Sequence, residues 1–144
     1  LHFSAVSWYV LGKTDVHKQV RVLKLARIRQ LEPTPKLFRK PKNFSVQEKL
    51  GRAWRLIPEG EIHHVELEFA PKVATNVSEV LWHPSQKSTI LPDGRCRMTF
   101  DVDGLSEIAW WLCGYADQVR VIAPTALRQR VAQMHKQAWT RQQG

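Results

Sequence analysis

The sequence predicts an α+β protein whose C-terminal part is a ferredoxin-like βαββαβ unit with an extra C-terminal helix. From Glu61 onward, segments with alternating apolar and polar residues are interleaved with segments in which apolar residues recur every three or four positions. These are the periods of a half-buried strand and of an amphipathic helix. The segments follow the order strand, helix, strand, strand, helix, strand, helix, which is typical of helices packed on one face of an antiparallel sheet.

The first sixty residues predict less regular structure. Residues 2–11 are rich in β-branched and aromatic residues and predict one strand, and residues 19–28 predict a second strand after a polar turn at 13–18. Residues 32–44 contain closely spaced prolines and several basic residues, which predicts a surface linker. The segment Ser45-Val46-Gln47-Glu48 has the form of a capping box and predicts a short helix ending near Gly51.

The helices and strands after Glu61 are predicted from the same two periods and from prolines that mark where elements begin or turn. Pro71 and Pro124 are expected at the starts of helices, and Pro92-Asp93-Gly94 is expected to form a turn between strands. The clearest strand is 95–102, in which Cys96, Met98, Phe100 and Val102 face one way and Arg95, Arg97, Thr99 and Asp101 face the other. We expect strands at 61–69, 87–91, 95–102 and 118–123, and helices at 71–83, 104–116 and 124–139.

The composition is that of a globular protein, with 43% hydrophobic and 24% charged residues. No apolar run approaches the length of a membrane span and no secretory signal is evident, so a cytoplasmic location is expected. The two cysteines lack metal-binding spacing, and the adjacent His63 and His64 would face opposite sides of a strand, so neither a metal site nor a cofactor is expected. Because no motif for nucleophilic, acid–base or phosphate-loop chemistry stands out, we do not expect an enzyme.

The excess of positive over negative charge lies in the first part of the chain. The net charge is +9, and residues 1–59 contain thirteen Lys and Arg against four Asp and Glu, whereas residues 60–144 contain nine of each. Clustered cations raise the local concentration of phosphates and carboxylates, which predicts an anionic partner such as a nucleic acid or a nucleotide-like effector. A basic surface that serves only solubility is the alternative.

Two segments near the N-terminus resemble a known family. Trp8-Tyr9-Val10 resembles the Trp-Tyr-Leu triplet of the WYL domain, an Sm-like small β-barrel of bacterial transcriptional regulators. The segment 21–28 resembles the Arg-x-Phe-Arg-Leu-Asp-Arg-Ile signature of that family's next strand, with both outer arginines, the leucine and the isoleucine retained. This sequence departs from the family pattern at Val10, Leu23, Lys24 and Ala26.

A longer stretch, 61–131, resembles the C-terminal extension that follows WYL domains. The cues include Trp82-His83-Pro84-Ser85-Gln86, the segment 108–116 and the segment 119–124, in the family's order. The resemblance implies a partial WYL β-barrel at 1–33, a basic linker with a short helix at 34–60, and the extension at 61–144. It also implies a helix-turn-helix regulator that contacts DNA through an N-terminal domain absent from this chain.

The resemblance further implies a ligand site on the barrel. WYL proteins are thought to bind nucleotides, oligonucleotides or other phosphorylated signals in a basic pocket, and the matching residues here are Tyr9, Arg21, Lys24 and Arg27. Arginine suits phosphate because its planar fork makes two parallel hydrogen bonds. Regular pleating of 19–28 would place Arg21 and Arg27 on one face and Lys24 on the other. The alternative is a core tyrosine with solvated or locally paired arginines.

Trp110 and Trp111 form a possible interface. Consecutive helix positions lie about 100° apart, so one indole is expected to pack inward and the other at an edge or an interface. Because extensions of this type are reported to help regulators dimerise, we expect a homodimer. The sequence thus predicts an effector-sensing and dimerisation region of a transcriptional regulator. A nucleic-acid-binding fragment without a switch, or a structural oligomerisation remnant, remains an alternative.

Overall fold

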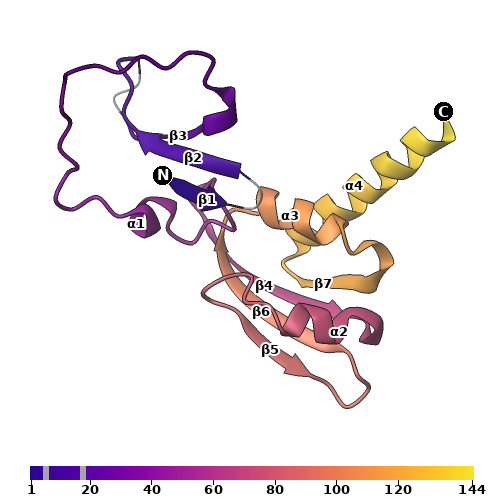
Figure 1. The fold of residues 1–144 in the computed structure, drawn as a ribbon. Helices are drawn as coiled ribbons and strands as arrows, with labels where there is room; N and C mark the ends of the chain where they lie inside the picture. The colour runs from indigo at the N-terminus through magenta and orange to yellow at the C-terminus, as the bar shows by residue number, and fades with distance from the viewer. Residues whose placement is uncertain (5–6, 17–18) are drawn as a thin grey trace. The chain divides into compact units, whose positions relative to one another are not determined.

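A computed structural model describes residues 1–4, 7–16 and 19–144. The chain divides into two compact units, Leu1–Gly51 and Arg52–Gly144, each with its own antiparallel sheet (Figure 1). The α+β prediction is therefore confirmed. In the described residues both sheets are open, and the first does not close into a barrel.

The first unit contains a three-stranded sheet in the order β1-β2-β3. Its elements are β1 (His2–Ser4), β2 (Ser7–Gly12), β3 (Arg21–Lys24), the 3₁₀ helix η1 (Leu25–Arg27) and α1 (Val46–Leu50). The single strand predicted at 2–11 is wrong, because β1 and β2 pair with each other and bring the rings of Phe3 and Trp8 to 5.2 Å. Residues 5–6 and 17–18, in the expected first strand and turn, lie outside the described residues.

The short helix predicted after Ser45 is confirmed. The Ser45 hydroxyl accepts a hydrogen bond from the Glu48 amide at 3.3 Å, as the first half of a capping box requires. The segment between η1 and α1 is almost entirely exposed and contains no helix or strand, as expected for a linker.

The second unit has the predicted ferredoxin-like topology. Its sheet has the order β5-β6-β4-β7, and every neighbouring pair is antiparallel. Two strands separated by a helix thus flank a third, which is the split βαβ arrangement. The elements are β4 (Ile62–Phe69), α2 (Pro71–Ser78), β5 (Lys87–Ile90), β6 (Cys96–Asp103), α3 (Ser106–Cys113), η2 (Ala116–Gln118), β7 (Val119–Ala123) and α4 (Thr125–Gln143).

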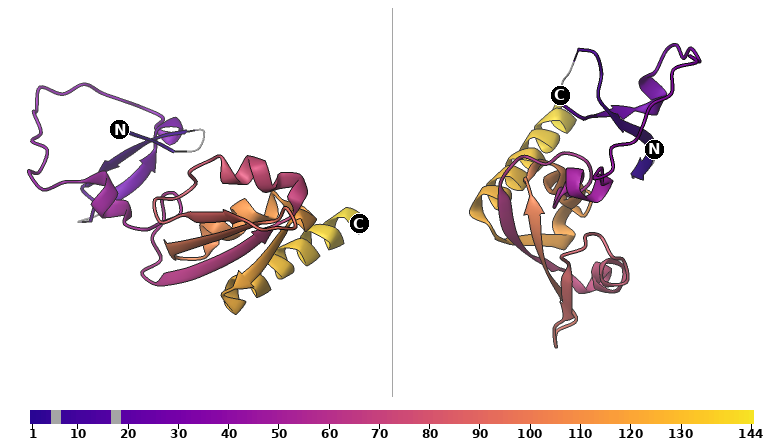
Figure 2. Two further views of the ribbon diagram at one scale, coloured as in Figure 1. Left: turned by 90° about the horizontal axis from the view of Figure 1, so that it is seen from below. Right: turned by 90° about the vertical axis from the view of Figure 1, so that its left-hand side faces the viewer.

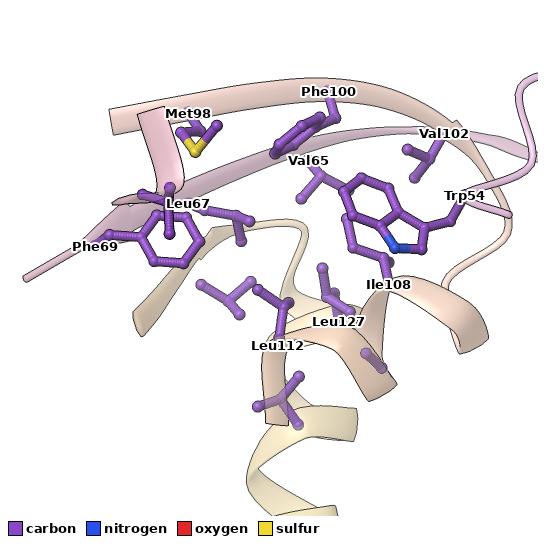
Figure 3. Packing of buried hydrophobic residues seen from close by; sticks show 14 of the residues in the cluster. Trp54, Val65, Leu67, Phe69, Met98, Phe100, Val102, Ile108, Leu112 and Leu127 are labelled. Carbon is purple, nitrogen blue, oxygen red and sulfur yellow. The ribbon is translucent and has the colours of Figure 1, made fainter. Parts of the chain in front are cut away.

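One face of this sheet forms the core. The four apolar side chains predicted to face inward from 95–102 are all buried, and they pack beside Val65, Leu67 and Phe69 of β4. Figure 3 shows the labelled side chains of β4 and β6 facing Ile108 and Leu112 of α3 and Leu127 of α4. The opposite face of the sheet carries the polar alternates and is covered by no helix of the second unit.

Helix α2 ends earlier than the sequence predicts. It stops at Ser78 rather than near position 83, because side chains of the following segment bind the backbone carbonyls at its end. The Trp82 indole donates to the Val77 carbonyl at 2.9 Å, and the Gln86 amide donates to the Val80 carbonyl at 2.9 Å. These hydrogen bonds replace the ones that a continued helix would make.

Helix α4 runs past the core. Val131 is its last buried residue, and from Lys136 onward every residue is exposed. The last turns accordingly extend beyond the rest of the second unit in Figures 1 and 2.

Residues 52–60 belong to the second unit, although the sequence analysis assigned them to the linker. The Glu107 carboxylate accepts hydrogen bonds from the backbone amides of 55–57 at 2.9–3.2 Å. The Asp103 carboxylate accepts from the amides of Glu59 and Gly60 at 2.8 and 2.7 Å. Carboxylates from the end of β6 and the start of α3 therefore fix this segment.

Glu59, from the same segment, binds backbone amides at the start of α3. Its carboxylate accepts from the amides of Leu105 and Ser106, both at 3.1 Å, which satisfies unpaired N–H groups at the helix N-terminus. A hydrogen bond with Ser106 is the largest of the effects that lower the pKa of Glu59. Gly104 adopts φ +87° beside this carboxylate, and a Cβ there would lie 2.5 Å from the Glu59 Cγ.

Candidate anion-binding site and the family of the chain

Tyr9 and Lys24 form a cross-strand pair in the first sheet. The register places them directly opposite each other on β2 and β3, and both are partly buried. Directly opposite residues in an antiparallel pair share a face, with Cβ atoms about 4.5–5.5 Å apart. Leu11 and Val22, the next pair on this face, are also partly buried. The side chains of Tyr9 and Lys24 thus project from one face of the sheet, next to the apolar pair Leu11 and Val22.

Arg21 lies on the other face of the same sheet. It pairs with Gly12, three positions before Lys24, and is exposed. Arg27 is not on the strand, because β3 ends at Lys24 and the chain enters η1. The predicted shared face for Arg21 and Arg27 is therefore wrong. Ala26 lacks the branched side chain that favours a strand, and the Ile28 amide closes a turn on the Leu25 carbonyl at 3.0 Å.

The described cations of the first unit form no ion pairs. Within the part of the chain that the structure describes, no carboxylate pairs with Arg21, Lys24 or Arg27. The basic side chains of the linker are exposed as well, at Lys36, Arg39, Lys40 and Lys42. An anion that approaches the first unit therefore meets no competing carboxylate at these positions.

An exposed aromatic pair lies on the Arg21 face. Phe3 and Trp8 pair across β1 and β2, make an edge-to-face contact, and are each about half exposed, at 53% and 50%. Alternation along β2 and the pairing with β3 place Val10, Leu23 and Arg21 on the same side. The sequence reasoning did not select Phe3 or Trp8. The spacing of Trp8 and Val10, two positions apart on a strand, could have indicated that they share a face. Phe3 joins them through the β1–β2 hairpin, which was not predicted.

A second charged cluster lies on the open face of the second sheet, around Glu68. Its carboxylate, only 4% exposed, accepts hydrogen bonds from Arg95, Arg97 at 3.3 Å and Arg120 at 2.9 Å. Burial raises the pKa of Glu68, but the hydrogen bond from Arg97 and the charges of Arg95 and Arg120 outweigh it and lower the pKa overall. Asp93 and Glu66 also pair with these arginines. The positive charge here is compensated within the domain, so this cluster is structural.

The two adjacent tryptophans have different environments. Trp111 is partly buried and packs against Trp54 and Trp82, with ring centroids 4.7 and 5.1 Å away. Trp110 is 74% exposed. The prediction that one indole packs inward and the other sits outside is confirmed, and Trp111 contributes to the core rather than to a surface.

Three of the described histidines, His63, His64 and His83, have separate partners. His64 Nδ1 lies 2.8 Å from the Asp101 carboxylate, and His63 Nε2 lies 3.7 Å from Glu61. Over the described ranges, no group of three His, Cys, Asp or Glu side chains is arranged to hold a metal ion. Among the helices that the structure describes, none has the length and hydrophobicity needed to span a bilayer.

The strand order and the single helical layer define a ferredoxin-like α+β domain preceded by a small open sheet. The chain belongs to the WCX family, because the model of the WCX domain matches residues 61–139. The WCX domain is the extension associated with WYL domains, so the predicted resemblance of 61–131 to that extension is confirmed. Membership in this family indicates a regulatory C-terminal region.

Among solved structures, the chain is similar to proteasome accessory factor B/C (PafBC) of Arthrobacter aurescens. The identity is 23% and the TM-score 0.40, and the similarity covers 87% of this chain and 19% of that one. The present chain thus spans about a fifth of the length of PafBC. A comparison with curated proteins gave no match.

Proposed function

We propose that this chain is the effector-sensing and dimerisation region of a transcriptional regulator, and that its β2–β3 pair binds a phosphorylated or oligonucleotide ligand. The observation that carries the proposal is the direct pairing of Tyr9 with Lys24. These residues lie on the two segments that resemble the WYL signatures. They precede a WCX domain in the same chain.

The two residues supply complementary contacts to a phosphate. The Lys24 ammonium group provides a charge with three hydrogen-bond donors, and the Tyr9 hydroxyl provides a neutral donor beside it. Arg27, which follows β3 within three positions, adds a second cation near the same end of the strand. A terminal phosphate or a nucleotide is the smallest ligand that would use this set.

A longer ligand would use the other face of the sheet as well. Phe3 and Trp8 offer ring surfaces on which bases can stack, and Arg21 on the same face offers a contact to the phosphate backbone. We therefore propose that short phosphorylated ligands depend on Tyr9 and Lys24, and that oligonucleotides depend on Arg21 and Trp8 in addition.

Sensing requires that the ligand bind one arrangement of the regulator better than another. A ligand with equal affinity for both arrangements shifts nothing, however tightly it binds. The proposal therefore requires a change in dimer geometry or in DNA affinity upon ligand binding. It does not follow from binding alone.

Fluorescence anisotropy with labelled single-stranded oligonucleotides of several lengths, at several salt concentrations, tests the proposal. We expect saturable binding of a short ligand that falls at least tenfold in Lys24→Ala and severalfold in Tyr9→Phe. Arg29→Ala is the matched control, because Arg29 is an exposed arginine outside both β3 and η1. Equal losses in Lys24→Ala and Arg29→Ala would contradict a defined site.

A second function, nucleic-acid binding without a switch, is favoured by the exposed cations of the linker. In that case affinity would increase with oligonucleotide length, and log K would fall steeply with log salt, by about 0.7 per phosphate neutralised on a single strand. Each Lys→Ala substitution between 36 and 42 would then lower the affinity by a similar small factor.

The dimerisation part of the proposal concerns the second unit. Sedimentation equilibrium on the whole chain should show a dimer whose dissociation constant is insensitive to Arg21→Ala and Lys24→Ala. A monomer at all accessible concentrations would remove dimerisation from the proposed function and leave ligand binding untouched.

A further inference from the structure

A groove of about 500 Å³ runs between helices α3 and α4, within the second unit. Its apolar wall includes Trp110 and Cys113 of α3 and Met134 of α4, with the sulfur atoms of Cys113 and Met134 3.9 Å apart. Trp110 is among the most exposed large apolar side chains of the chain. Drug-sized ligands typically occupy pockets of roughly this size, lined by apolar and aromatic groups with a few polar ones.

The charged groups of the groove are the two arginines, Arg130 and Arg141. Arg130, His135 and Arg141 of α4 line it together with the apolar residues. Helix α4 contains no Asp or Glu, and the only acid of α3 is Glu107. Since Glu107 is held by the amides of 55–57, it is not available to neutralise the groove.

The two arginines are not equivalent. Arg130 donates to the Ser106 hydroxyl at 2.8 Å, and its charge is also one of the smaller contributions that lower the pKa of Glu59, after the hydrogen bond with Ser106. Within the described residues, the side chain of Arg141 makes no hydrogen bond or ion pair. Arg141 is therefore the uncompensated cation of the groove.

His135 lines the groove with its imidazole ring, whereas the ring Nε2 atom has almost no exposed surface and makes no hydrogen bond in the described structure. A molecule in the groove therefore meets the ring and not this nitrogen.

A twofold contact between α4 and its own copy is disfavoured in this groove. Two α4 helices related by a twofold axis would place cation against cation, because α4 carries only basic charges. An anion with an apolar body matches both properties of the groove at once.

We propose that the α3–α4 groove binds a small amphipathic carboxylate, an aliphatic or aromatic acid whose body packs on Trp110 and Met134 and whose carboxylate pairs with Arg141. This site is separate from the proposed phosphate site in the first unit, and it takes a ligand without phosphate. The WCX domain would then respond to a second chemical signal.

The test uses the whole chain with anilinonaphthalene sulfonate as a fluorescent amphipathic anion, and with decanoate as a competitor. We expect one saturable site per chain, displaced by decanoate and not by the neutral decanol. Trp110→Ala and Arg141→Gln should each weaken binding at least tenfold, and Arg130→Gln less, because Arg130 is already engaged by Ser106.

Two matched controls come from the same helix. Trp139→Ala removes an exposed tryptophan, and Arg128→Gln removes an exposed arginine that bonds to Thr125, and neither residue lines the groove. Both variants should bind the dye and decanoate as the parent chain does. Circular dichroism of each variant establishes that it is folded, since dyes of this type also bind partly unfolded chains.

Three results would overturn the proposal. Binding that is unchanged in Trp110→Ala and Arg141→Gln would place the dye elsewhere. Displacement by decanol as effective as that by decanoate would remove the role of the carboxylate. A chain dimer that dissociates in Trp110→Ala would assign the groove to a second copy. None of these results depends on whether the first unit binds phosphate.

Discussion

Replacing Gly104 by alanine should destabilise the second unit by more than the backbone conformation alone explains. Gly104 adopts φ +87°, where L-residues are strained, and the added Cβ would lie 2.5–2.7 Å from three side-chain carbons of Glu59. Contacts below 3.0 Å force one group to move. The movable group is Glu59, whose carboxylate caps the first turn of α3.

The expected loss of stability has two contributions. A left-handed conformation costs an alanine about 1–2 kcal/mol. Displacing a capping side chain from a helix N-terminus costs about 0.5–2 kcal/mol. We therefore expect the free energy of unfolding to fall by about 1.5–4 kcal/mol, which is a large share of the stability of a domain of this size.

The assay is urea unfolding followed by tryptophan fluorescence, to which Trp54 and Trp111 of the core contribute. With a slope of about 1–3 kcal/mol per molar urea, the midpoint should fall by on the order of 1–2 M. Gly60→Ala is the matched control, because Gly60 has φ +91° and a Cβ there would have no neighbour within 4 Å. This control should show only the backbone cost, about 1–2 kcal/mol.

A double-mutant cycle with Glu59→Gly isolates the contact. Glycine is required at position 59, since alanine would retain the Cβ that lies 2.7 Å from the added atom. In the Glu59→Gly background, Gly104→Ala should cost no more than Gly60→Ala costs in the parent chain. If Gly104→Ala and Gly60→Ala were equal in the parent chain, the assignment of strain to Glu59 would be refuted.

Three further predictions concern the second unit. Glu68→Gln should cost the most stability above about pH 4.5, and this cost should disappear as the pH falls through the folded-state pKa of Glu68. The reason is that folding lowers this pKa from its ordinary value of 4.5. Urea unfolding at several pH values measures the effect. Trp111→Ala should cost about 3–5 kcal/mol, and Trp110→Ala less than about 1 kcal/mol, in thermal unfolding, since only Trp111 packs in the core. Cys96 is fully buried and burial raises its pKa, so Ellman's reagent should react with it at pH 8 only at the rate of unfolding, and fast labelling would contradict the burial.

Local patterns made much of the second unit predictable. The alternation over 95–102 specifies which side chains are buried, because side chains on a strand alternate between faces whatever the strand pairs with. The start of a helix at Pro71 was equally predictable from the sequence, since proline suits the first turn of a helix. The cluster around Glu68 could not be predicted from local patterns. Arg97 of β6, Arg95 just before β6 and Arg120 of β7 come from segments that only the sheet order brings together with β4.

For the candidate site in the first unit, the sequence predicted which residues belong to it but not how they are arranged. Tyr9 and Lys24 were both selected, but their direct pairing depends on strand register, which a single sequence does not specify. The separation of Arg21 from Arg27 depends on where β3 ends. That end is decided by a local turn at Leu25–Arg27 in competition with strand pairing. The groove between α3 and α4 was missed because its walls come from two helices whose packing was unknown.

The two border strands of the second sheet affect how the protein behaves at high concentration. β5 has only four residues, all exposed and beginning with Lys87, and β7 has a bulge opposite Glu66 and Leu67 and is followed by Pro124. Short length, charge, bulges and proline all hinder the addition of a further strand from another molecule. Intermolecular β-pairing, the usual route to fibrils and precipitates, is therefore disfavoured at both borders of this sheet.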